Sequence, residues 1–289
     1  MNITDRYLLG ITRPGCTDLA AAVTSLLTEK DCVITELAQL NDIQTGQFFC
    51  RVELCKPESG LMPAELSNRF SAFSERFGVD WKFFDLSVSH RALILVSKFD
   101  HYLDNLSYRK QPPELNIDIT TVASNHPYLE AMARFLIVSF KVLPADGSKF
   151  ATKATQEERI RELIEGQGVD LVLLARYMQV LSKESCQNPA ERCFNIYQSF
   201  SSSSDEARSF HEAYERGEEA IGATAHYGTL DLDEGPIIDQ EVARVDHTCR
   251  LGQLLATGRN IENYSFSREV RANSEHRVFL NGHKTVVLK

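Results

Sequence analysis

Residues 91–99 read RALILVSKF, and this stretch decides the fold of most of the chain. Its apolar residues are continuous rather than alternating, which is typical of a strand buried on both faces of a parallel sheet. Similar strand-like runs follow at residues 118–126, 140–146 and 170–178. Helix-like segments separate them at residues 100–109, 127–135 and 156–166. This alternation predicts a parallel, doubly wound α/β sheet, in which ligands bind at the carboxyl ends of the strands.

The segments on either side of this core have different patterns. Residues 1–86 follow the order strand, helix, strand, strand, helix, strand, which is the ferredoxin-like split unit. Residues 222–229 and 235–245 are adjacent strand-like runs that we expect to pair antiparallel, and a long helix should follow them. Residues 277–288 read RVFLNGHKTVVL, which predicts a hairpin with Asn281-Gly282 at its turn.

The composition excludes several classes of protein. The chain has 289 residues, enough for one large or two smaller domains, and a net charge of −9. That charge argues against a nucleic-acid partner, and no run of about 18 apolar residues suggests a membrane span. Seven scattered cysteines without a CxxC pair indicate free thiols in a cytoplasmic protein. Neither the cysteines nor the histidines have the spacing of a metal site, so no metal is expected.

Two polar clusters follow strand-like runs in the first part of the predicted sheet. His101 and Asp104 would lie one turn apart at the start of a helix, a position where polar ligands bind. Asn125 and His126 precede Pro127, which suits the first turn of another helix. The alternative for His101 and Asp104 is helix capping with surface charge, and the alternative for Asn125 and His126 is helix capping.

The run that ends near residue 175 leads into the segment LARYMQVLS, residues 174–182. Arg176 and Met178 directly follow the apolar strand, at the edge where ligands bind. Tyr177, Val180 and Leu181, together with Met178, can form a wall for a flat aromatic ligand. Core packing is the alternative interpretation of the same side chains.

Two further segments carry groups suited to hydrolysis. FNIYQSF, residues 194–200, places Asn195 at the end of a buried strand, where its amide can stabilise a developing oxyanion. AHYGTLDLDEGPI, residues 225–237, brings His226 close in sequence to Asp231 and Asp233. A carboxylate and an imidazole together can activate water. A polar turn between two strands is the alternative for this second segment.

Together these segments resemble the formyltetrahydrofolate deformylase family over nearly the whole chain. The resemblance rests on GITRPGCTDLAAAVT, TGQFFCRVEL, SNHPYLE, LVLLARYMQVLS and GRNIE, and most specifically on ATAHY followed by LDEGPI. It implies an α/β protein with a ferredoxin-like ACT domain at residues 1–86 and a Rossmann-like formyltransferase-fold domain at residues 87–289. It also implies hydrolysis of 10-formyltetrahydrofolate to formate and tetrahydrofolate, with folate as the substrate and no cofactor.

The same resemblance assigns roles to individual residues. Asn195 and Asp233 match the Asn and Asp of the family, and His226 matches a second histidine in its ATAHY strand. The folate ring would lie against the segment after residue 175, and the turn around Asp231 would close over it. The implied substrate-binding residues are Arg176, Tyr177, Met178, Val180, Leu181, Thr229, Leu230 and Asp231. An ACT domain further implies an amino-acid effector and a homo-dimer or tetramer.

One position departs from the family in a way that matters for catalysis. The family reads approximately Asn-Ile-His-His-Ser-Phe-Leu-Pro, whereas this chain has Tyr197 at the catalytic histidine and Gln198 at the next residue. A histidine titrates near pH 6.5 and a tyrosine near pH 10, so Tyr197 is a poor base at neutral pH. Proton donation to the formamide nitrogen should therefore weaken. Ser201–Ser204 replace the Leu-Pro and the glycine of the family loop, and we assign them no role.

Three functions are compatible with this departure. The first is a working deformylase in which Tyr197 or a neighbour replaces the histidine. The second is a relative that acts on another formyl compound or transfers the formyl group to an amine. The third is a non-catalytic protein that binds folate or an amino acid on the same scaffold. Release of formate from 10-formyltetrahydrofolate supports the first, and folate binding without turnover supports the third.

Overall fold

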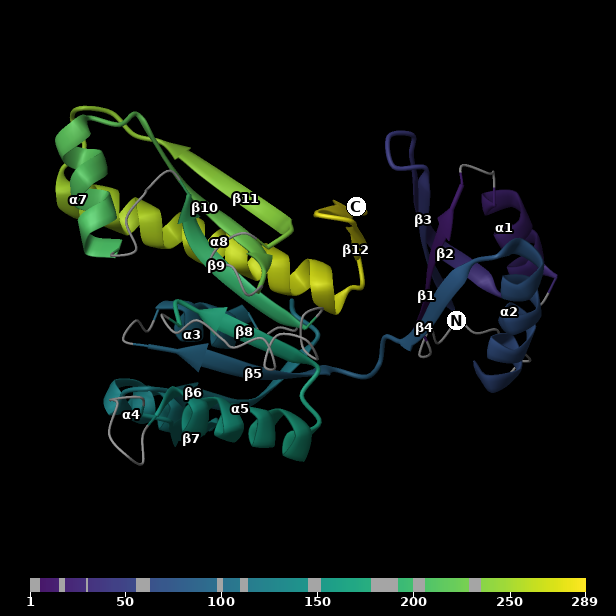
Figure 1. The fold of residues 1–289 in the computed structure, drawn as a ribbon, viewed down its shortest axis with the longest axis horizontal. Coiled ribbons are helices and arrows are strands. Elements are labelled where there is room, and N and C mark those ends of the chain that lie inside the picture. Colours follow the sequence, from purple (N-terminus) through teal and green to yellow (C-terminus); the bar gives the residue numbers. More distant parts are fainter. Residues whose placement is uncertain are drawn as a thin grey trace. The chain divides into compact units, whose positions relative to one another are not determined.

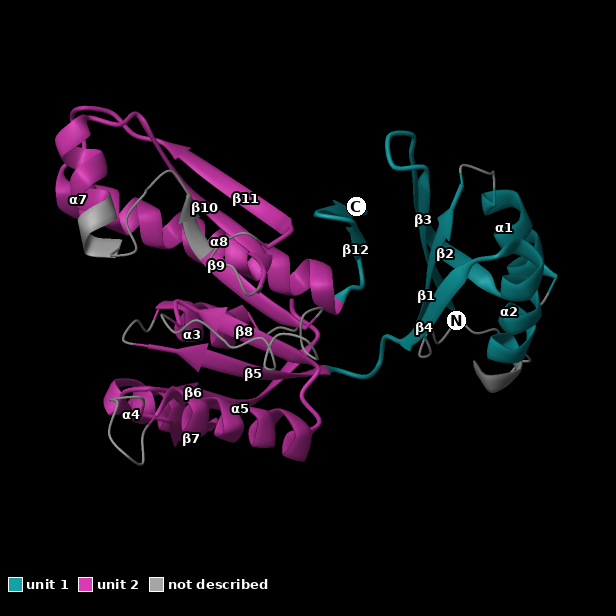
Figure 2. Cartoon of the chain, in the orientation of Figure 1, with its two compact units in different colours: residues 1–89, 275–289 teal, residues 90–274 magenta. Residues whose placement is uncertain are grey.

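The computed structural model describes the chain apart from residues 1–5, 16–18, 30, 56–62, 98–100, 110–113, 145–151, 178–191, 200–205 and 229–234. The chain folds into two compact units (Figures 1 and 2). Unit 1 contains residues 1–89 and 275–289, and unit 2 contains residues 90–274. The chain therefore passes between the units twice.

Unit 1 contains a four-stranded antiparallel sheet in the order β2-β3-β1-β4. Its elements are β1 (Arg6–Pro14), α1 (Ala20–Thr28), β2 (Val33–Asp42), β3 (Gln47–Cys55), α2 (Pro63–Phe77) and β4 (Asp80–Asp85). Leu27 of α1 and Phe70 of α2 are buried against Val52 of β3, because their apolar residues recur at helical spacing. The element order is the ferredoxin-like one expected from the sequence.

The C-terminal hairpin, β12 (Val278–Asn281) and β13 (Lys284–Val287), also belongs to unit 1. Its turn is at Asn281-Gly282, as the sequence predicts, and Gly282 takes the positive φ of 66° that such turns require. The sequence predicts a second domain at residues 87–289 that includes the hairpin, whereas the structure places the hairpin in unit 1. The reason is apolar burial, since Val286 and Leu288 pack with Phe49 of β3.

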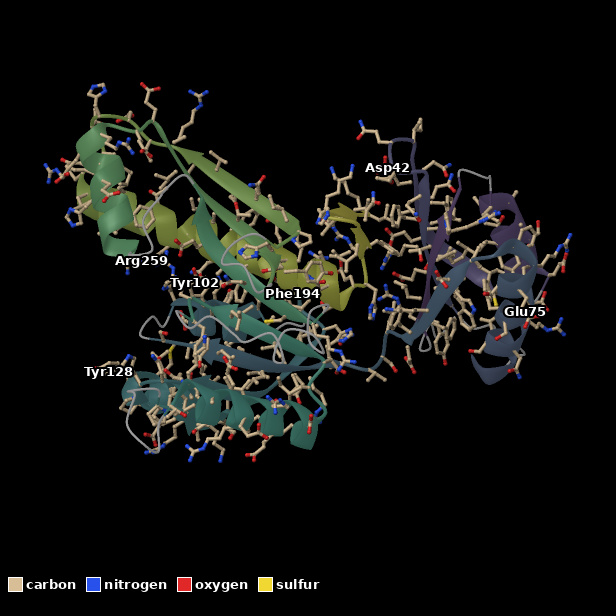
Figure 3. The ribbon with its side chains drawn as sticks, in the orientation of Figure 1. Asp42, Glu75, Tyr102, Tyr128, Phe194 and Arg259 are labelled. Atoms are coloured by element: carbon tan, nitrogen blue, oxygen red, sulfur yellow. The ribbon has the colours of Figure 1, made fainter. Side chains whose placement is uncertain are left out.

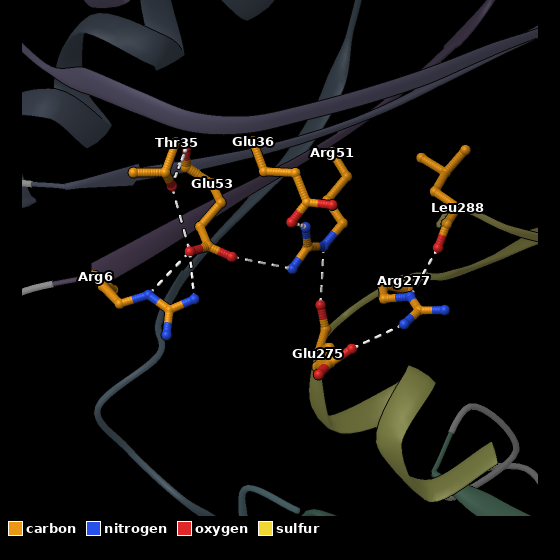
Figure 4. A network of polar contacts seen from close by, with 8 residues as sticks. All are labelled: Arg6, Thr35, Glu36, Arg51, Glu53, Glu275, Arg277 and Leu288. Atoms are coloured by element: carbon orange, nitrogen blue, oxygen red, sulfur yellow. Dashed lines mark hydrogen bonds and ion pairs between the residues drawn. The ribbon is translucent and has the colours of Figure 1, made fainter. Parts of the chain in front are cut away.

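A polar network holds residues 275–288 against the same sheet (Figure 4). Arg51 is only 3% exposed, and its Nε donates to the carbonyl oxygen of Glu275 at 3.0 Å. Its two terminal nitrogens lie 2.9 Å from Glu36 and 3.5 Å from Glu53, and Nε of Arg6 donates to Glu53 at 2.9 Å. A buried guanidinium is tolerated only with such partners, so the network fixes the start of the C-terminal segment.

Unit 2 contains a seven-stranded mixed sheet in the order β11-β10-β9-β8-β5-β6-β7 (Figure 1). Its strands are β5 (His90–Val96), β6 (Ile117–Ser124), β7 (Ser139–Val142), β8 (Leu171–Ala175), β9 (Cys193–Ser199), β10 (Ala220–Tyr227) and β11 (Ile237–Arg244). Its helices are α3 (His101–Arg109), η1 (Pro127–Leu129), α4 (Glu130–Phe135), α5 (Lys153–Gln167), α7 (Glu206–Arg216) and α8 (Leu251–Ser274). Neighbouring strands are parallel in the pairs β7-β6, β6-β5, β5-β8 and β8-β9, whereas β10 is antiparallel to both β9 and β11. This confirms the predicted parallel sheet and the predicted antiparallel pair that follows it.

Different helices cover the two faces of this sheet. Ile160 of α5 packs with Cys193 of β9, so we call this side the α5 face. On the opposite side, which we call the α8 face, the hydroxyl of Tyr227 donates to Asn273 of α8 at 3.4 Å. Helix α3 packs against α8. No helix within the described ranges is long and apolar enough to cross a membrane.

Glu269 is a fully buried carboxyl group on α8. Neither of its carboxyl oxygens has a hydrogen-bond partner among the residues that the structure describes. Burial, and secondarily the negative charge of Asp239, raises the pKa of Glu269 well above its usual value. Above about pH 4.3, Glu269 ionises in the unfolded chain but stays protonated in the folded chain. Its contribution to the free energy of unfolding therefore falls by about 1.4 kcal/mol per pH unit, up to the pKa of Glu269 in the folded state.

We therefore expect Glu269→Gln to be more stable than the wild type at pH 8, with a difference that shrinks towards pH 5. The amide keeps the shape of the side chain and removes its ionisation. Urea unfolding followed by circular dichroism at both pH values measures the effect. Glu215→Gln, at an exposed glutamate of α7, is the matched control and should show no such trend. An effect of Glu269→Gln that is equal at both pH values would contradict the prediction.

Candidate functional site

Asn195 and His226 lie side by side where the parallel part of the sheet meets the antiparallel part. Asn195 is on β9, His226 is on β10, and the two are register partners. Residues directly opposite each other point to the same face, with Cβ atoms about 4.5–5.5 Å apart. Asn195 follows Cys193 by two residues and so shares its face of the strand. The structure thus brings two of the predicted catalytic residues together on the α5 face.

The imidazole of His226 is buried, with 2% of its surface exposed. Its Nδ1 lies 2.8 Å from the carbonyl oxygen of Tyr227. Because a carbonyl oxygen only accepts, Nδ1 carries a proton, so the tautomer with a single ring proton has its lone pair on Nε2. The hydrogen bond therefore orients the ring with Nε2 on the side away from the Tyr227 carbonyl.

The end of β10 depends on Gly235. The amide of Tyr227 donates to the carbonyl oxygen of Pro236 at 3.1 Å, which brings the two chain segments together. A Cβ atom at Gly235 would lie 1.7 Å from the carbonyl oxygen of Tyr227 and 2.9 Å from Nδ1 of His226. Only glycine fits here, and it leaves room for the carbonyl that orients His226.

We expect Gly235→Ala to disturb the site as well as the fold. The added methyl group must displace the Tyr227 carbonyl or the His226 ring. We therefore expect kcat of the hydrolysis implied by the family resemblance to fall by about 10²-fold, the loss that follows a shift of about 1 Å in a reacting group. Steady-state kinetics and thermal unfolding measure the two effects. Gly252→Ala is the control, since a Cβ atom there meets nothing within 4 Å. Unchanged kcat in Gly235→Ala would contradict this role for the carbonyl.

Several predicted residues fall outside the described part of the chain. Tyr197 is on β9, where its backbone pairs with Thr224 of β10, but its side chain is not described. The predicted residues that lie outside the described residues are Met178, Val180, Leu181, Thr229, Leu230, Asp231 and Asp233. Their roles remain predictions.

Arg176 and Tyr177 lie at the carboxyl end of β8, beside the site. Leu174 of β8 pairs in parallel with Asn195, so Arg176 is two residues beyond that pair. Its guanidinium forms a buried ion pair with Glu262 of α8. Tyr177 is 6% exposed and packs in the core of the α5 face, and burial raises its pKa. Tyr177 therefore follows the core-packing interpretation, and Arg176 is held by an ion pair within the protein.

The two earlier polar clusters follow β5 and β6. His101 lies at the start of α3, where Nε2 is 3.5 Å from Glu262. His126 takes the cap position before η1, with Pro127 as the next residue, and its amide donates to the hydroxyl of Ser124 at 3.1 Å. His126 thus occupies the N-cap position, but its side chain makes no capping hydrogen bond to any residue that the structure describes. Within the described residues, no group of three or more His, Cys, Asp or Glu side chains could hold a metal ion.

Comparison with known proteins identifies the family. Residues 90–270 match the family model described as formyl transferase. A protein named formyltetrahydrofolate deformylase from Corynebacterium sp. is 38% identical over 284 residues, covering 98% of this chain and 98% of that protein. The chain belongs to the formyltetrahydrofolate deformylase family. The Escherichia coli deformylase is 32% identical over 292 residues and is covered completely.

Solved structures agree with this deformylase assignment. The crystal structure of the formyltetrahydrofolate deformylase from Burkholderia mallei is 40% identical, with a TM-score of 0.91 over 99% of this chain and 100% of that one. Glycinamide ribonucleotide transformylase 1 from Symbiobacterium toebii is 22% identical, with a TM-score of 0.64 over 71% of this chain and 97% of that one. The transformylase shows a shared fold, and the deformylases show the family of the whole chain.

Sequence reasoning missed the partners of Arg176 in this deformylase-family chain. Glu262 and Tyr102 are each 1% exposed. Glu262 lies within the polar stretch GRNIENYS, which in isolation is typical of a solvent-facing helix surface. No local pattern marks it as buried, because its burial depends on α3 and β8 packing against α8.

Proposed function

We propose that this chain hydrolyses 10-formyltetrahydrofolate to formate and tetrahydrofolate. One observation carries the proposal. The chain matches proteins named formyltetrahydrofolate deformylase over 98% or more of its length, at 32% to 40% identity. Asn195 and His226, which the family pattern assigns to catalysis, also share one face of the sheet as register partners. Their geometry supports a common site.

Asn195 is proposed to polarise the formyl group. When water attacks the formyl carbon, the formyl oxygen gains negative charge. A carboxamide nitrogen can donate a hydrogen bond to that oxygen and stabilises the transition state more than the substrate. A position on a paired strand suits this role, because β8 and β10 on either side limit the movement of Asn195.

Asp233 and His226 are proposed to activate the water. By its match to the family Asp, Asp233 takes a proton from the water as its oxygen bonds to the formyl carbon. Nε2 of His226, which bears the lone pair in the assigned tautomer, orients the water or accepts its proton. The bond between the formyl carbon and the folate nitrogen then breaks, and that nitrogen takes a proton. Formate and tetrahydrofolate are the two products.

Folate is the substrate in this proposal, and the chain needs no cofactor. Met178, Val180 and Leu181 would form the wall beside the ring. Backbone of Thr229, Leu230 and Asp231 would close over it. The match of LARYMQVLS and of the LDEGPI turn to the family pattern supports this placement.

The decisive test is formate release from 10-formyltetrahydrofolate by the purified protein. We expect formate and tetrahydrofolate in equal amounts. Asp233→Asn keeps the size of the side chain and removes the proton acceptor, so kcat should fall by about 10²- to 10⁴-fold. No formate release by the wild type at enzyme concentrations that would detect one turnover would sink the proposal.

Tyr197 favours a second candidate function, folate binding without rapid turnover. The family has its catalytic histidine at this position, and a phenol is a poor base at neutral pH. Isothermal titration with tetrahydrofolate and the formate assay with 10-formyltetrahydrofolate together separate the two candidates. A binding protein would bind tetrahydrofolate and release no formate, whereas a deformylase would do both.

The ferredoxin-like part of unit 1 is proposed to be an ACT domain. The β1-α1-β2-β3-α2-β4 order and the antiparallel sheet support this. By the same resemblance, it would bind an amino-acid effector and pair with a second copy to give a homo-dimer or tetramer in the cytoplasm. Light scattering and amino-acid titrations of the full chain test both parts.

A further inference from the structure

Four side chains from three elements of unit 2 form a buried polar cluster. Arg176 from the end of β8 forms an ion pair with Glu262 of α8, and its Nε lies 3.2 Å from the hydroxyl of Tyr102 of α3. That hydroxyl donates to Glu262 at 2.6 Å. His101 of α3 places Nε2 3.5 Å from the same carboxylate. Tyr102, labelled in Figure 3, is buried along its whole length and meets the ring of Phe266 edge-on.

At the centre of the cluster, the guanidinium of Arg176 and the carboxylate of Glu262 form an ion pair. Burial by itself would raise the pKa of Glu262, but the hydrogen bond from His101 and the charge of Arg176 lower it below its usual value. The carboxylate is therefore ionised and needs its cation. An ion pair this deeply buried is held in one arrangement, because removing either charge leaves the other without compensation.

Arg176 also has an unusual backbone conformation. Its φ is 52°, in the left-handed region that residues with a side chain rarely adopt. Such conformations persist only where the surrounding structure holds them, and they are concentrated at functional sites. Two elements hold Arg176 within the described residues: α8 through Glu262 and α3 through Tyr102.

The turn at Arg176 sends two consecutive side chains to opposite faces of the sheet. Arg176 points to Tyr102 and Glu262 on the α8 face. Tyr177 packs in the core of the α5 face, which is also the face of Asn195 and His226. The turn therefore determines the face on which Tyr177 packs, immediately after the strand that adjoins Asn195.

We propose that Arg176 is a positioning residue, held by Glu262 and Tyr102, that maintains the left-handed turn at the end of β8 and so holds this strand end, with Tyr177, on the face of Asn195 and His226 where folate is proposed to bind. This role rests on the proposed function of the site. It assigns Arg176 a contact with the protein rather than with the substrate. Glu262 and Tyr102 then act on the reaction only through Arg176.

A rescue experiment distinguishes positioning from direct contact. Glu262→Gln removes the counter-charge of Arg176, and we expect KM for 10-formyltetrahydrofolate to rise about 10-fold with kcat changed less than about 3-fold. Glycine adopts a left-handed turn without strain. The double variant Arg176→Gly with Glu262→Gln should therefore return KM to within about 3-fold of the wild type. If the guanidinium contacts folate, the double variant stays impaired, and the proposal is wrong.

Crystal structures of these variants give a readout that does not depend on turnover. We expect residue 176 to keep a positive φ in the double variant and to lose it, or to populate it incompletely, in Glu262→Gln. If Glu262→Gln does not fold, Tyr102→Phe is the milder variant, because it retains the ring against Phe266. We expect it to raise KM by about 3-fold. A lowered melting temperature with unchanged KM and unchanged φ in both single variants would indicate a purely structural cluster and overturn the proposal.

Failure of the proposed function gives a different result. If the wild type releases no formate, the dissociation constant for tetrahydrofolate, measured by isothermal titration, replaces KM and should show the same rise and the same rescue. If the wild type binds no folate either, the proposed function fails, and a positive φ that survives in Glu262→Gln and Tyr102→Phe overturns the positioning role independently.

Discussion

Replacing Tyr197 by histidine is expected to raise kcat for formate release from 10-formyltetrahydrofolate by about 10²- to 10⁴-fold, the usual contribution of a general acid or base. Residues two apart on a strand share a face. An imidazole at position 197 is therefore expected on the face that carries Asn195, since the backbone there pairs with Thr224, two residues before His226. An imidazole there could give a proton to the folate nitrogen as its bond to the formyl carbon breaks. A phenol with a pKa near 10 does so less readily and returns the proton slowly.

Two neighbouring variants serve as controls for Tyr197→His. Gln198→His adds an imidazole one residue further, on the opposite face of β9, and should leave kcat unchanged. Tyr197→Phe removes only the hydroxyl, and a fall in kcat would show that the phenol already participates. The pH profile of Tyr197→His should gain a step near pH 6.5. A variant that folds, binds tetrahydrofolate and shows no gain would mean that position 197 does not face the reacting group.

Replacing Asn195 by alanine is expected to lower kcat by about 10²- to 10³-fold, as loss of one oxyanion donor does in other hydrolases. The effect should fall mainly on kcat, because the hydrogen bond strengthens as the formyl oxygen gains charge. Rapid-quench measurement of formate release in a single turnover isolates this step from product release. Circular dichroism and thermal unfolding show whether the strand remains intact.

Asn273→Ala is the matched control for Asn195→Ala. It removes another carboxamide, on the α8 face, whose oxygen accepts from the Tyr227 hydroxyl at 3.4 Å. We expect a change in kcat of less than about 3-fold, since this amide lies across the sheet from His226. Equal losses in the two variants would indicate damage to the sheet rather than to an oxyanion site. A full-rate Asn195→Ala enzyme would remove Asn195 from the mechanism.

Much of the fold follows from local sequence patterns. The continuous apolar run in β5 predicts a strand with both faces covered, and the structure places β5 between two parallel neighbours. The Asn281-Gly282 turn predicts the hairpin, because few residues tolerate its positive φ. The unit to which the hairpin belongs was predicted incorrectly. The apolar side chains of Val286 and Leu288 predict burial, but no local pattern identifies Phe49 as the residue against which they pack.

The sequence by itself determined the family, the two sheet types and the identity of the candidate catalytic groups, because these depend on residue types at fixed spacings. Only the tertiary structure decided which groups meet. Strand pairing places Asn195 beside His226. The packing of α8 brings the carboxylate of Glu262 to Arg176, from which it is 86 residues distant in sequence. Local periodicity reports how one element is buried, whereas an ion pair between elements depends on the relative placement of both.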